Sequence, residues 1–420
     1  MSTSPSQRNP IHGVTRRQVL TGGAALASAL AFPAIVKGAA KDVIVGAVLP
    51  LTGPSAEFGQ TTWRALQFAC EIMNEQGGVK ALGGAKLSPQ VAETQSKPEI
   101  AAAQAQQLIE RGASVLIGCN QSASTIVATQ VAERAKVPFL TAYDIDPTIT
   151  ARGFKYTFRC SPLTSNFAND LLQCIKEISE KRGKPAKRLG ILSENSLTGL
   201  GANKYATEAA TRLGYEIVDT STYQSGRTQS FAPYITKLKS KGVEVLVGHN
   251  RVADAVLIVR TAMELKFNPI AVGGILGASG TQEFVDVLHA DAENIFATEN
   301  WALELKIPGM RAVAERFEKK VGTKMDASTA VMTANVAVIW DSLESAKTAD
   351  PQALREAIAA TKLNPGDRGY FLVGGVAFTP TGDNTRASSL ITQVQKGNHV
   401  PVWPASIAIA EAVYPKPAWS

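Results

Sequence analysis

The sequence predicts an α/β protein with two lobes, each containing a parallel sheet flanked by helices. Short β-branched runs alternate with longer helical patterns from residue 42 to residue 274. This alternation is typical of parallel sheets that carry helices on both faces. About eight or nine such strands precede residue 300, more than one continuous sheet commonly holds. We therefore expect two sheets rather than one.

The elements follow in order from residue 42. The first strand spans 42–50, and the helix at 61–75 places Leu66, Ala69 and Met73 on one face before two glycines end it. Further strands are expected at 113–118, 137–141, 188–193, 215–222, 243–248 and 270–274. Further helices are expected at 122–135, 199–213, 229–241, 253–265, 309–321, 326–347 and 351–361. Short strands at 370–379 and 388–396 complete the pattern.

The composition is that of an ordinary globular protein and excludes several classes. With 45% hydrophobic and 19% charged residues, the 420-residue chain can bury a sizeable core. Residues 1–40 hold four basic and no acidic residues, and removing these charges from the formal +7 leaves +3, too little to indicate nucleic-acid binding. The four His and four Cys form no clustered motif, and no GxGxxG follows the first strand. We therefore expect no metal and no cofactor.

Residues 1–40 have the pattern of an export signal. Arg16 and Arg17 precede a weakly hydrophobic, Gly/Ala-rich stretch at 18–36. Paired arginines in this place resemble a twin-arginine signal, a receptor-read address that predicts a periplasmic protein. The alternative is an uncleaved anchor, but Gln, Thr, Ser, Gly and Pro make the stretch a poor membrane span.

An oxidising compartment would allow the cysteines to pair, because their number is even. Cys119 ends an apolar strand and Cys70 lies in the apolar stripe of a helix, so buried free thiols are equally open. The sequence does not choose between these alternatives for Cys70, Cys119, Cys160 and Cys174.

The loops that follow strands are the candidate functional region, because ligands of doubly wound sheets bind beyond the carboxyl ends of strands. Several of these loops place Ser, Thr, Asn or Gly where a helix begins. A helix start offers unpaired N–H groups and positive dipole potential, which suit a carboxylate. The loops span residues 51–60, 119–122, 142–147, 194–198, 249–252 and 275–279.

Five segments in this order, behind an export signal, carry a family resemblance: residues 44–60, 72–79, 116–122, 137–140 and 375–383. They resemble the substrate-binding proteins of ABC importers related to the leucine/isoleucine/valine-binding protein. The resemblance implies two Rossmann-like lobes joined by three crossovers, the type I periplasmic binding fold, with a ligand between the lobes. It also implies a lobe 1 of 42–161 plus 298–372 and a lobe 2 of 162–297 plus 373–420.

In lobe 1, the resemblance implies that Ser122 holds a ligand carboxylate. Ser122 precedes an apolar-periodic helix and is also a natural N-cap, so it serves either the ligand or only the helix. Phe58 stands where the family often has an aromatic residue in the first loop, and it either covers an apolar ligand or packs in the core.

Tyr143 and Asp144 follow the third strand, and there the chain departs from the branched-chain amino acid binders. Ile145 stands where those proteins have a threonine that contacts the ligand. Asp144 either receives an ammonium group or is an ordinary loop acid. Part of the amino-acid site is therefore in doubt.

In lobe 2, Thr198 and Arg251 stand at or near positions where the family has aromatic residues. Arg251 either makes a bidentate pair with a carboxylate or is a solvated helix-start residue. Residues 273–277 lack the acid that pairs with an α-ammonium in the amino-acid binders, and a desolvated ammonium without a counter-charge is costly. Trp301, on an expected crossover, either stacks on a planar ligand or belongs to the core.

These observations favour a solute-binding protein without catalysis. It would act as a monomer and deliver a small carboxylate-bearing ligand to an inner-membrane ABC permease by hinge closure. The ligand alternatives are a hydrophobic or branched-chain amino acid and an aromatic or other amine-free acid. Two other functions stay open: a periplasmic ligand sensor module and an exported α/β enzyme, although no Walker or GxSxG motif occurs.

Overall fold

The structure is a computed structural model that describes residues 40–419. The predicted export signal therefore lies, apart from Ala40, outside the described residues. Within 40–419, no helix has both the length and the hydropathy that crossing a membrane requires.

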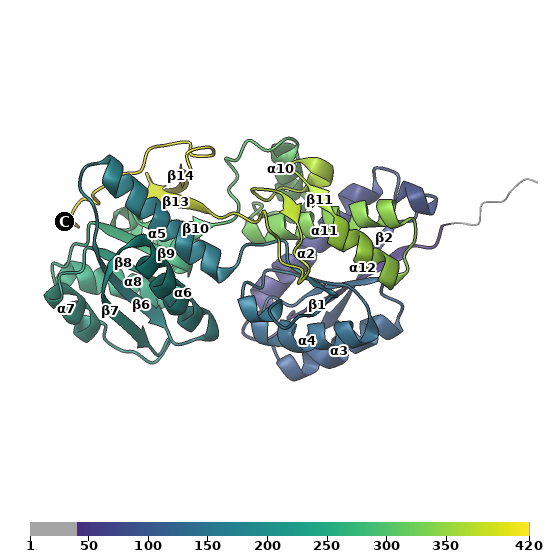
Figure 1. The fold of residues 1–420 in the computed structure, drawn as a ribbon, viewed down its shortest axis with the longest axis horizontal. Coiled ribbons are helices and arrows are strands. Elements are labelled where there is room, and N and C mark those ends of the chain that lie inside the picture. The colour runs from purple at the N-terminus through teal and green to yellow at the C-terminus, as the bar shows by residue number, and fades with distance from the viewer. Residues whose placement is uncertain (1–39, 420) are drawn as a thin grey trace, which may run out of the picture. The chain divides into compact units, whose positions relative to one another are not determined.

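The first sheet contains five parallel strands in the order β2-β1-β3-β4-β5 (Figure 1). Its strands are β1 (Val43–Leu49), β2 (Leu87–Glu93), β3 (Val115–Gly118), β4 (Phe139–Thr141) and β5 (Thr157–Phe158). Six helices accompany it: α2 (Ala56–Asn74), α3 (Pro98–Glu110), α4 (Ser122–Ala135), α10 (Met310–Val321), α11 (Ala327–Ala346) and α12 (Pro351–Ala360). Nearly all of β1 is buried, as expected for a central strand with helices on both faces.

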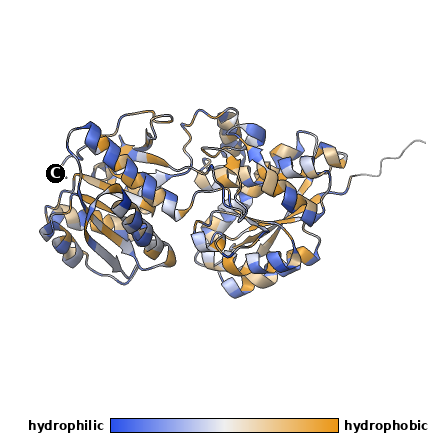
Figure 2. Ribbon diagram, in the orientation of Figure 1, coloured by the Kyte–Doolittle hydropathy of each residue, from blue (hydrophilic) through white to orange (hydrophobic). Residues whose placement is uncertain are grey.

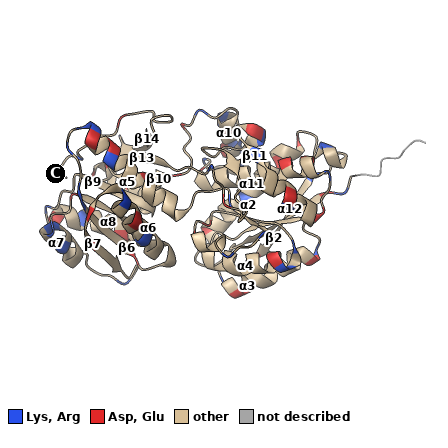
Figure 3. Ribbon diagram, viewed as in Figure 1, with Lys and Arg blue, Asp and Glu red and all other residues tan. Residues whose placement is uncertain are grey.

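The second sheet has the order β14-β13-β10-β9-β8-β6-β7, with β13 and β14 antiparallel. Its strands are β6 (Arg188–Glu194), β7 (Glu216–Tyr223), β8 (Val245–Asn250), β9 (Ala271–Gly277), β10 (Phe296–Glu299), β13 (Leu390–Gln395) and β14 (Asn398–Trp403). Its helices are α5 (Thr164–Lys181), α6 (Leu197–Leu213), α7 (Ala232–Ser240), α8 (Val252–Glu264) and α9 (Gln282–Leu288). The strands are mainly hydrophobic, whereas charged residues concentrate on the helices (Figures 2 and 3).

The parallel part of each sheet repeats one strand order. In chain order within each half, both β2-β1-β3-β4-β5 and β7-β6-β8-β9-β10 follow the pattern 2-1-3-4-5. This doubly wound order has a switch point between its first and third strands, where a crevice opens at the carboxyl ends. The loops after β1 and β3, and those after β6 and β8, therefore border the two crevices.

The chain passes between the sheets three times, after β5, after β10 and before β13. The first and third connections are bonded to each other: the Arg159 backbone N–H donates to the oxygen of Gly382 at 2.9 Å, and Asn384 Nδ2 donates to the Cys160 oxygen at 3.1 Å. The Arg159 side chain is fully buried and its Nη2 donates to Thr150 Oγ1 at 3.1 Å. The predicted α/β fold with three crossovers is confirmed.

Two predicted elements were wrong in extent, and the lobe boundaries stay a prediction. Helix α2 begins at Ala56, five residues before the predicted start, with the Gly59 N–H donating to the Ser55 oxygen. The predicted strand at 370–379 is reduced to β12 (Val376–Ala377), which pairs with β11 (Lys362–Leu363), because Gly374 and Gly375 have φ of 82° and 84°. Strand β10 spans the predicted boundary between residues 297 and 298.

All four cysteines are buried and free in the structure, which agrees with the second of the two alternatives. Burial raises the pKa of the Cys70 thiol to about 12. A thiol of this kind is almost entirely protonated at neutral pH and is a poor nucleophile.

In each half, a glycine in the helix after the half's first strand allows that helix to approach the strand. A Cβ on Gly59 would lie 1.9 Å from the oxygen of Pro50, and a Cβ on Gly199 would lie 2.0 Å from the oxygen of Glu194. Neither distance is compatible with a side chain. These glycines therefore hold the loops after β1 and β6 close to their sheets.

We predict that Gly199→Ala destabilises the protein although alanine is the better helix former. The new Cβ collides with backbone, and such overpacking costs about 1–3 kcal/mol. Gly201→Ala on the same helix is the matched control, because the nearest atom to its Cβ would be 4.0 Å away. Urea unfolding should show a gain of about 0.5–1 kcal/mol for the control. Equal stabilisation by both substitutions would contradict the close approach.

Candidate functional site

A cleft of about 580 Å³ lies at the carboxyl ends of strands from both sheets. This volume is within the usual range of small-molecule sites. Four of the six predicted loops contribute lining residues, which are Gln121, Ser122, Glu194, Ser196, Leu197, Thr198, His249, Asn250, Arg251, Val252, Gly277 and Ala278. Two further lining residues, Ala123 and Thr281, lie just beyond predicted loops. Three predicted site residues, Ser122, Thr198 and Arg251, thus line one space.

The amino end of α4 opens into this cleft. Ser122 is the first helical residue and not the predicted N-cap, because Gln121 has extended backbone angles and its oxygen accepts the first helical bond, from the Thr125 N–H at 2.9 Å. No side chain caps this end, and no acid lies in the first turn. The first-turn N–H groups can therefore take an anionic ligand.

Asp144 fixes the turn that leads into α4. Its side chain is 1% exposed, and its Oδ2 accepts from the backbone N–H groups of Cys119 at 2.9 Å and Asn120 at 3.2 Å. Burial raises the pKa of Asp144, while its hydrogen bonds act in the opposite direction. The geometry matches a positioning role. The other carboxylate oxygen, Oδ1, has no hydrogen-bond partner within the described residues, so whether Asp144 receives an ammonium group stays a prediction.

The other two helix starts at the cleft differ from α4. At α6 the Ser196 hydroxyl accepts from the Gly199 N–H at 3.1 Å, so that end is capped, and Thr198 lies in the first turn. At α8 the acid Asp254 lies in the first turn and offsets the dipole. Of these three helix starts, only α4 has neither a side-chain cap nor an acidic residue in its first turn, so its positive potential is the least compensated.

Arg251 reaches the cleft from the start of α8 and is paired through one nitrogen only. Its Nε lies 2.9 Å from Glu194 Oε2, and the Arg251 side chain is 71% exposed whereas that of Glu194 is 2% exposed. This geometry leaves the two terminal nitrogens of the guanidinium available for a ligand. Glu194 holds the arginine in place and balances its charge.

His249 adjoins the same carboxylate. Its Nδ1 lies 3.0 Å from the Ile275 oxygen, and its Nε2 lies 3.8 Å from Glu194 Oε1. A carbonyl only accepts, so Nδ1 carries the proton in the neutral ring. Burial lowers the pKa of His249, which favours this neutral form.

Phe58 and Tyr143 form a second group. Their rings meet edge to face with centroids 5.9 Å apart, and Phe58 lies in the first turn of α2 instead of in the predicted loop. Asn120 Nδ2 donates to Thr62 Oγ1 at 2.6 Å and connects this group to the turn before α4. Neither aromatic residue lines the 580 Å³ cleft. Their ligand contacts stay a prediction.

Trp301 lies in the core beside α10. It is 5% exposed, and its Nε1 lies 3.1 Å from the sulfur of Met310. The structure does not bring Trp301 together with Ser122, Thr198 and Arg251 among the cleft-lining residues. Stacking of this ring on a ligand stays a prediction.

Sequence reasoning did not single out Glu194, His249 or Glu299. Glu194 and His249 stand at strand ends in predicted loops, so the strand-end rule would have identified them. Glu299 ends β10, a four-residue strand absent from the predicted elements. Burial and the nearby Asp326 raise the pKa of Glu299 to about 8.

Comparison with known proteins gives one consistent result. Residues 42–398 match the family described as periplasmic binding protein. A Leu/Ile/Val-binding protein homolog from Brucella suis biovar 1 is 28% identical over 402 residues, covering 92% of this chain and 98% of the relative.

Solved structures agree in fold. A leucine-binding protein from Thermotoga maritima has a TM-score of 0.71 at 22% identity, covering 86% of this chain and 97% of that one. A branched-chain amino acid transporter substrate-binding protein from Streptococcus pneumoniae, in complex with isoleucine, has a TM-score of 0.69 at 20% identity. The latter comparison covers 86% of this chain and 98% of that one.

Glu299 should make stability depend on pH. The folded protein keeps its proton up to about pH 8, whereas the unfolded chain releases it near 4.5, so the free energy of unfolding falls as pH rises through this window. Asp326 acts on the Glu299 carboxyl, and both acids in turn raise the pKa of Tyr143 after its burial. Glu299→Gln should flatten the fall measured by urea unfolding at pH 5, 6.5 and 8. Glu283→Gln, at an exposed acid of α9, should keep the wild-type slope; an unchanged slope in Glu299→Gln would refute the assignment.

Proposed function

The chain belongs to the periplasmic binding protein family, and on this basis we propose that it delivers a small carboxylate-bearing ligand to an ABC importer. It resembles binding proteins of the branched-chain amino acid transporter type along most of its length. The finer assignment, to a carboxylate ligand, depends on the chemistry of the cleft.

One observation supports this assignment more than any other. The uncapped start of α4 and the terminal nitrogens of Arg251 face one cleft from opposite sheets. A helix start and a guanidinium both prefer an anion, and a carboxylate suits both geometries. Glu194 already balances Arg251, so the anion of the ligand would meet the remaining positive potential of the helix start.

The proposed mechanism is hinge closure without catalysis. Ligand would bind first at α4 on one sheet, and closure would then add contacts from Arg251 and Thr198 on the other. The ligand drives closure only by the difference between its affinities for the closed and open states. The closed form would be the one presented to an inner-membrane permease. We place the protein in the periplasm as a monomer, after export by its twin-arginine segment.

Arg251→Gln should weaken carboxylate binding about 10-fold to 100-fold, the effect of losing one charge-assisted hydrogen bond of about 1.5–3 kcal/mol. Isothermal titration calorimetry with a panel of amino acids, aromatic acids and aliphatic acids measures this change. Arg260→Gln is the matched control, since Arg260 is exposed on the same helix and lies outside the cleft lining. Exclusive binding of uncharged amides, or equal affinities in the two variants, would overturn the carboxylate assignment.

Saturating ligand should shrink the protein in solution. Closure brings the two sheets' loops onto the ligand, so small-angle X-ray scattering should give a smaller radius of gyration with ligand than without it. Arg251→Gln should need a higher ligand concentration for the same change. Scattering curves that stay identical at saturation would contradict hinge closure.

A further inference from the structure

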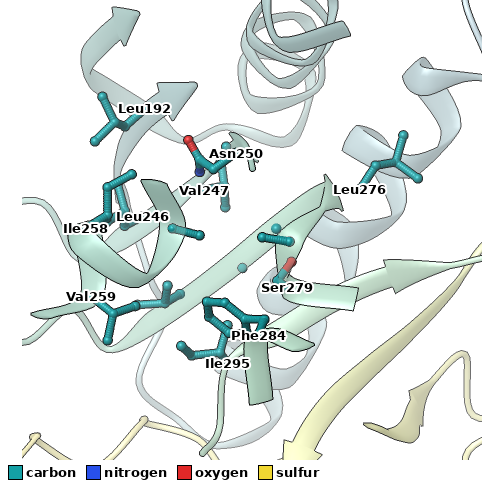
Figure 4. A pocket seen from close by; sticks show the side chains of 16 residues that line it. Leu192, Leu246, Val247, Asn250, Ile258, Val259, Leu276, Ser279, Phe284 and Ile295 are labelled. Atoms are coloured by element: carbon teal, nitrogen blue, oxygen red, sulfur yellow. The ribbon is translucent and has the colours of Figure 1, made fainter. Parts of the chain in front are cut away.

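An apolar cavity of about 50 Å³ adjoins the cleft inside the second half of the molecule. It lies between strands β8 and β9 and helix α8, and Figure 4 shows side chains around one space. Most of these side chains are aliphatic or aromatic, among them Leu246, Ile258, Val259, Phe284 and Ile295. Asn250 and Ala278 line both this cavity and the cleft. These two residues therefore contact both spaces.

One polar atom of the cavity lining has no partner within the described residues. The Ser279 hydroxyl has no hydrogen-bond partner within the described residues, although Ser279 is only 7% exposed. A Cβ on Gly274 would lie 1.6 Å from this hydroxyl, so glycine is what leaves room for it. Asn250 Oδ1 accepts a hydrogen bond from the Tyr223 hydroxyl at 2.9 Å. The amide nitrogen of Asn250 takes no part in this bond. The entrance can thus bind a polar group and the interior an apolar one.

The cavity volume restricts the apolar group. An engineered protein cavity of about 150 Å³ binds benzene, whereas a single water needs about 10–15 Å³. At about 50 Å³, this cavity is too small for an aromatic ring but accepts a compact aliphatic group. Its apolar lining would gain dispersion contacts from such a group.

The charges of the cleft argue against a ligand ammonium. Glu194 is the one carboxylate among the cleft-lining residues, and Arg251 already pairs with it at 2.9 Å. An ammonium placed in the cleft would lose hydration without an unpaired counter-charge. The ligand anion meets no such obstacle at α4.

We propose that this cavity receives the apolar end of the ligand, and that the ligand is an amine-free carboxylate with a compact aliphatic substituent. The inference rests on the proposed binding function and narrows its ligand class. It excludes aromatic acids because their ring is too large for the cavity, and α-amino acids because the cleft lining offers their ammonium no unpaired carboxylate.

Calorimetry with the exported protein tests the ligand class. Four probes are compared: 4-methyl-2-oxopentanoate, leucine, phenylpyruvate and pyruvate. Leucine has the same carbon skeleton as 4-methyl-2-oxopentanoate but carries an ammonium group in place of the keto oxygen. Phenylpyruvate has a phenyl ring in place of the branched end, and pyruvate lacks the branched end. We expect the first to bind at least tenfold more tightly than each of the other three. Tighter or equal binding of leucine or phenylpyruvate would overturn the inference while leaving the binding function intact. Binding of none of the four would refute the inference, whereas the proposed function is refuted only if the wider panel of amino, aromatic and aliphatic acids also fails to bind.

Filling the cavity tests its role directly. Ala255 lines it from α8, so Ala255→Leu should lower the affinity for 4-methyl-2-oxopentanoate at least tenfold and leave the affinity for pyruvate within twofold. Ala253→Leu, at an exposed position of the same helix, is the control and should change neither affinity. Val259→Ile adds one methyl group to the same cavity and replaces Ala255→Leu if that variant does not fold. Unchanged affinity in the folded filling variant would show that the ligand does not enter the cavity.

Discussion

The candidate site depends on one buried carboxylate. Asp144 accepts from the backbone of Cys119 and Asn120, and this bonding sets the direction in which the chain enters α4. The uncapped N–H groups of that helix consequently face the cleft instead of the core. The bonds of the Asp144 carboxylate thus help to determine where the start of α4 lies relative to the cleft. Backbone donors replace part of the hydration that Asp144 loses, through Oδ2, whereas Oδ1 has no hydrogen-bond partner in the described part of the chain.

The second half supplies its part of the cleft through the same strand order. Because β1 and β3, and likewise β6 and β8, flank a switch point, each half has two loops that diverge at the strand ends. In the second half these loops carry Glu194 and Arg251, which meet across the crevice. The two halves share this strand order but not the residues in the equivalent loops. The first half contributes the uncapped start of α4, and the second contributes the ion pair between Arg251 and Glu194.

Hydrophobic periodicity was sufficient to predict most of the strands and helices. The strand-end rule predicted the loops that contain Ser122, Thr198 and Arg251, and the family resemblance singled out these residues, which line one cleft. Strand β2 was missed because Pro89 and polar residues interrupt it, which an edge strand tolerates. The role of Asp144 and the burial of Trp301 depend on contacts between segments far apart in the chain. The pairing of Glu194 with Arg251 likewise joins two different βα units, so no local pattern contains it.

The bonds between the first and third connections constrain how the halves can move. The Arg159 N–H of one connection donates to the Gly382 oxygen of the other, and the Asn384 side chain donates to the Cys160 oxygen, beside the fully buried side chain of Arg159. These bonds couple the two segments, so in the proposed hinge closure we expect them to bend together. Such coupling would favour rotation about one axis over shear, and the loops on either side would then meet in the same register each time.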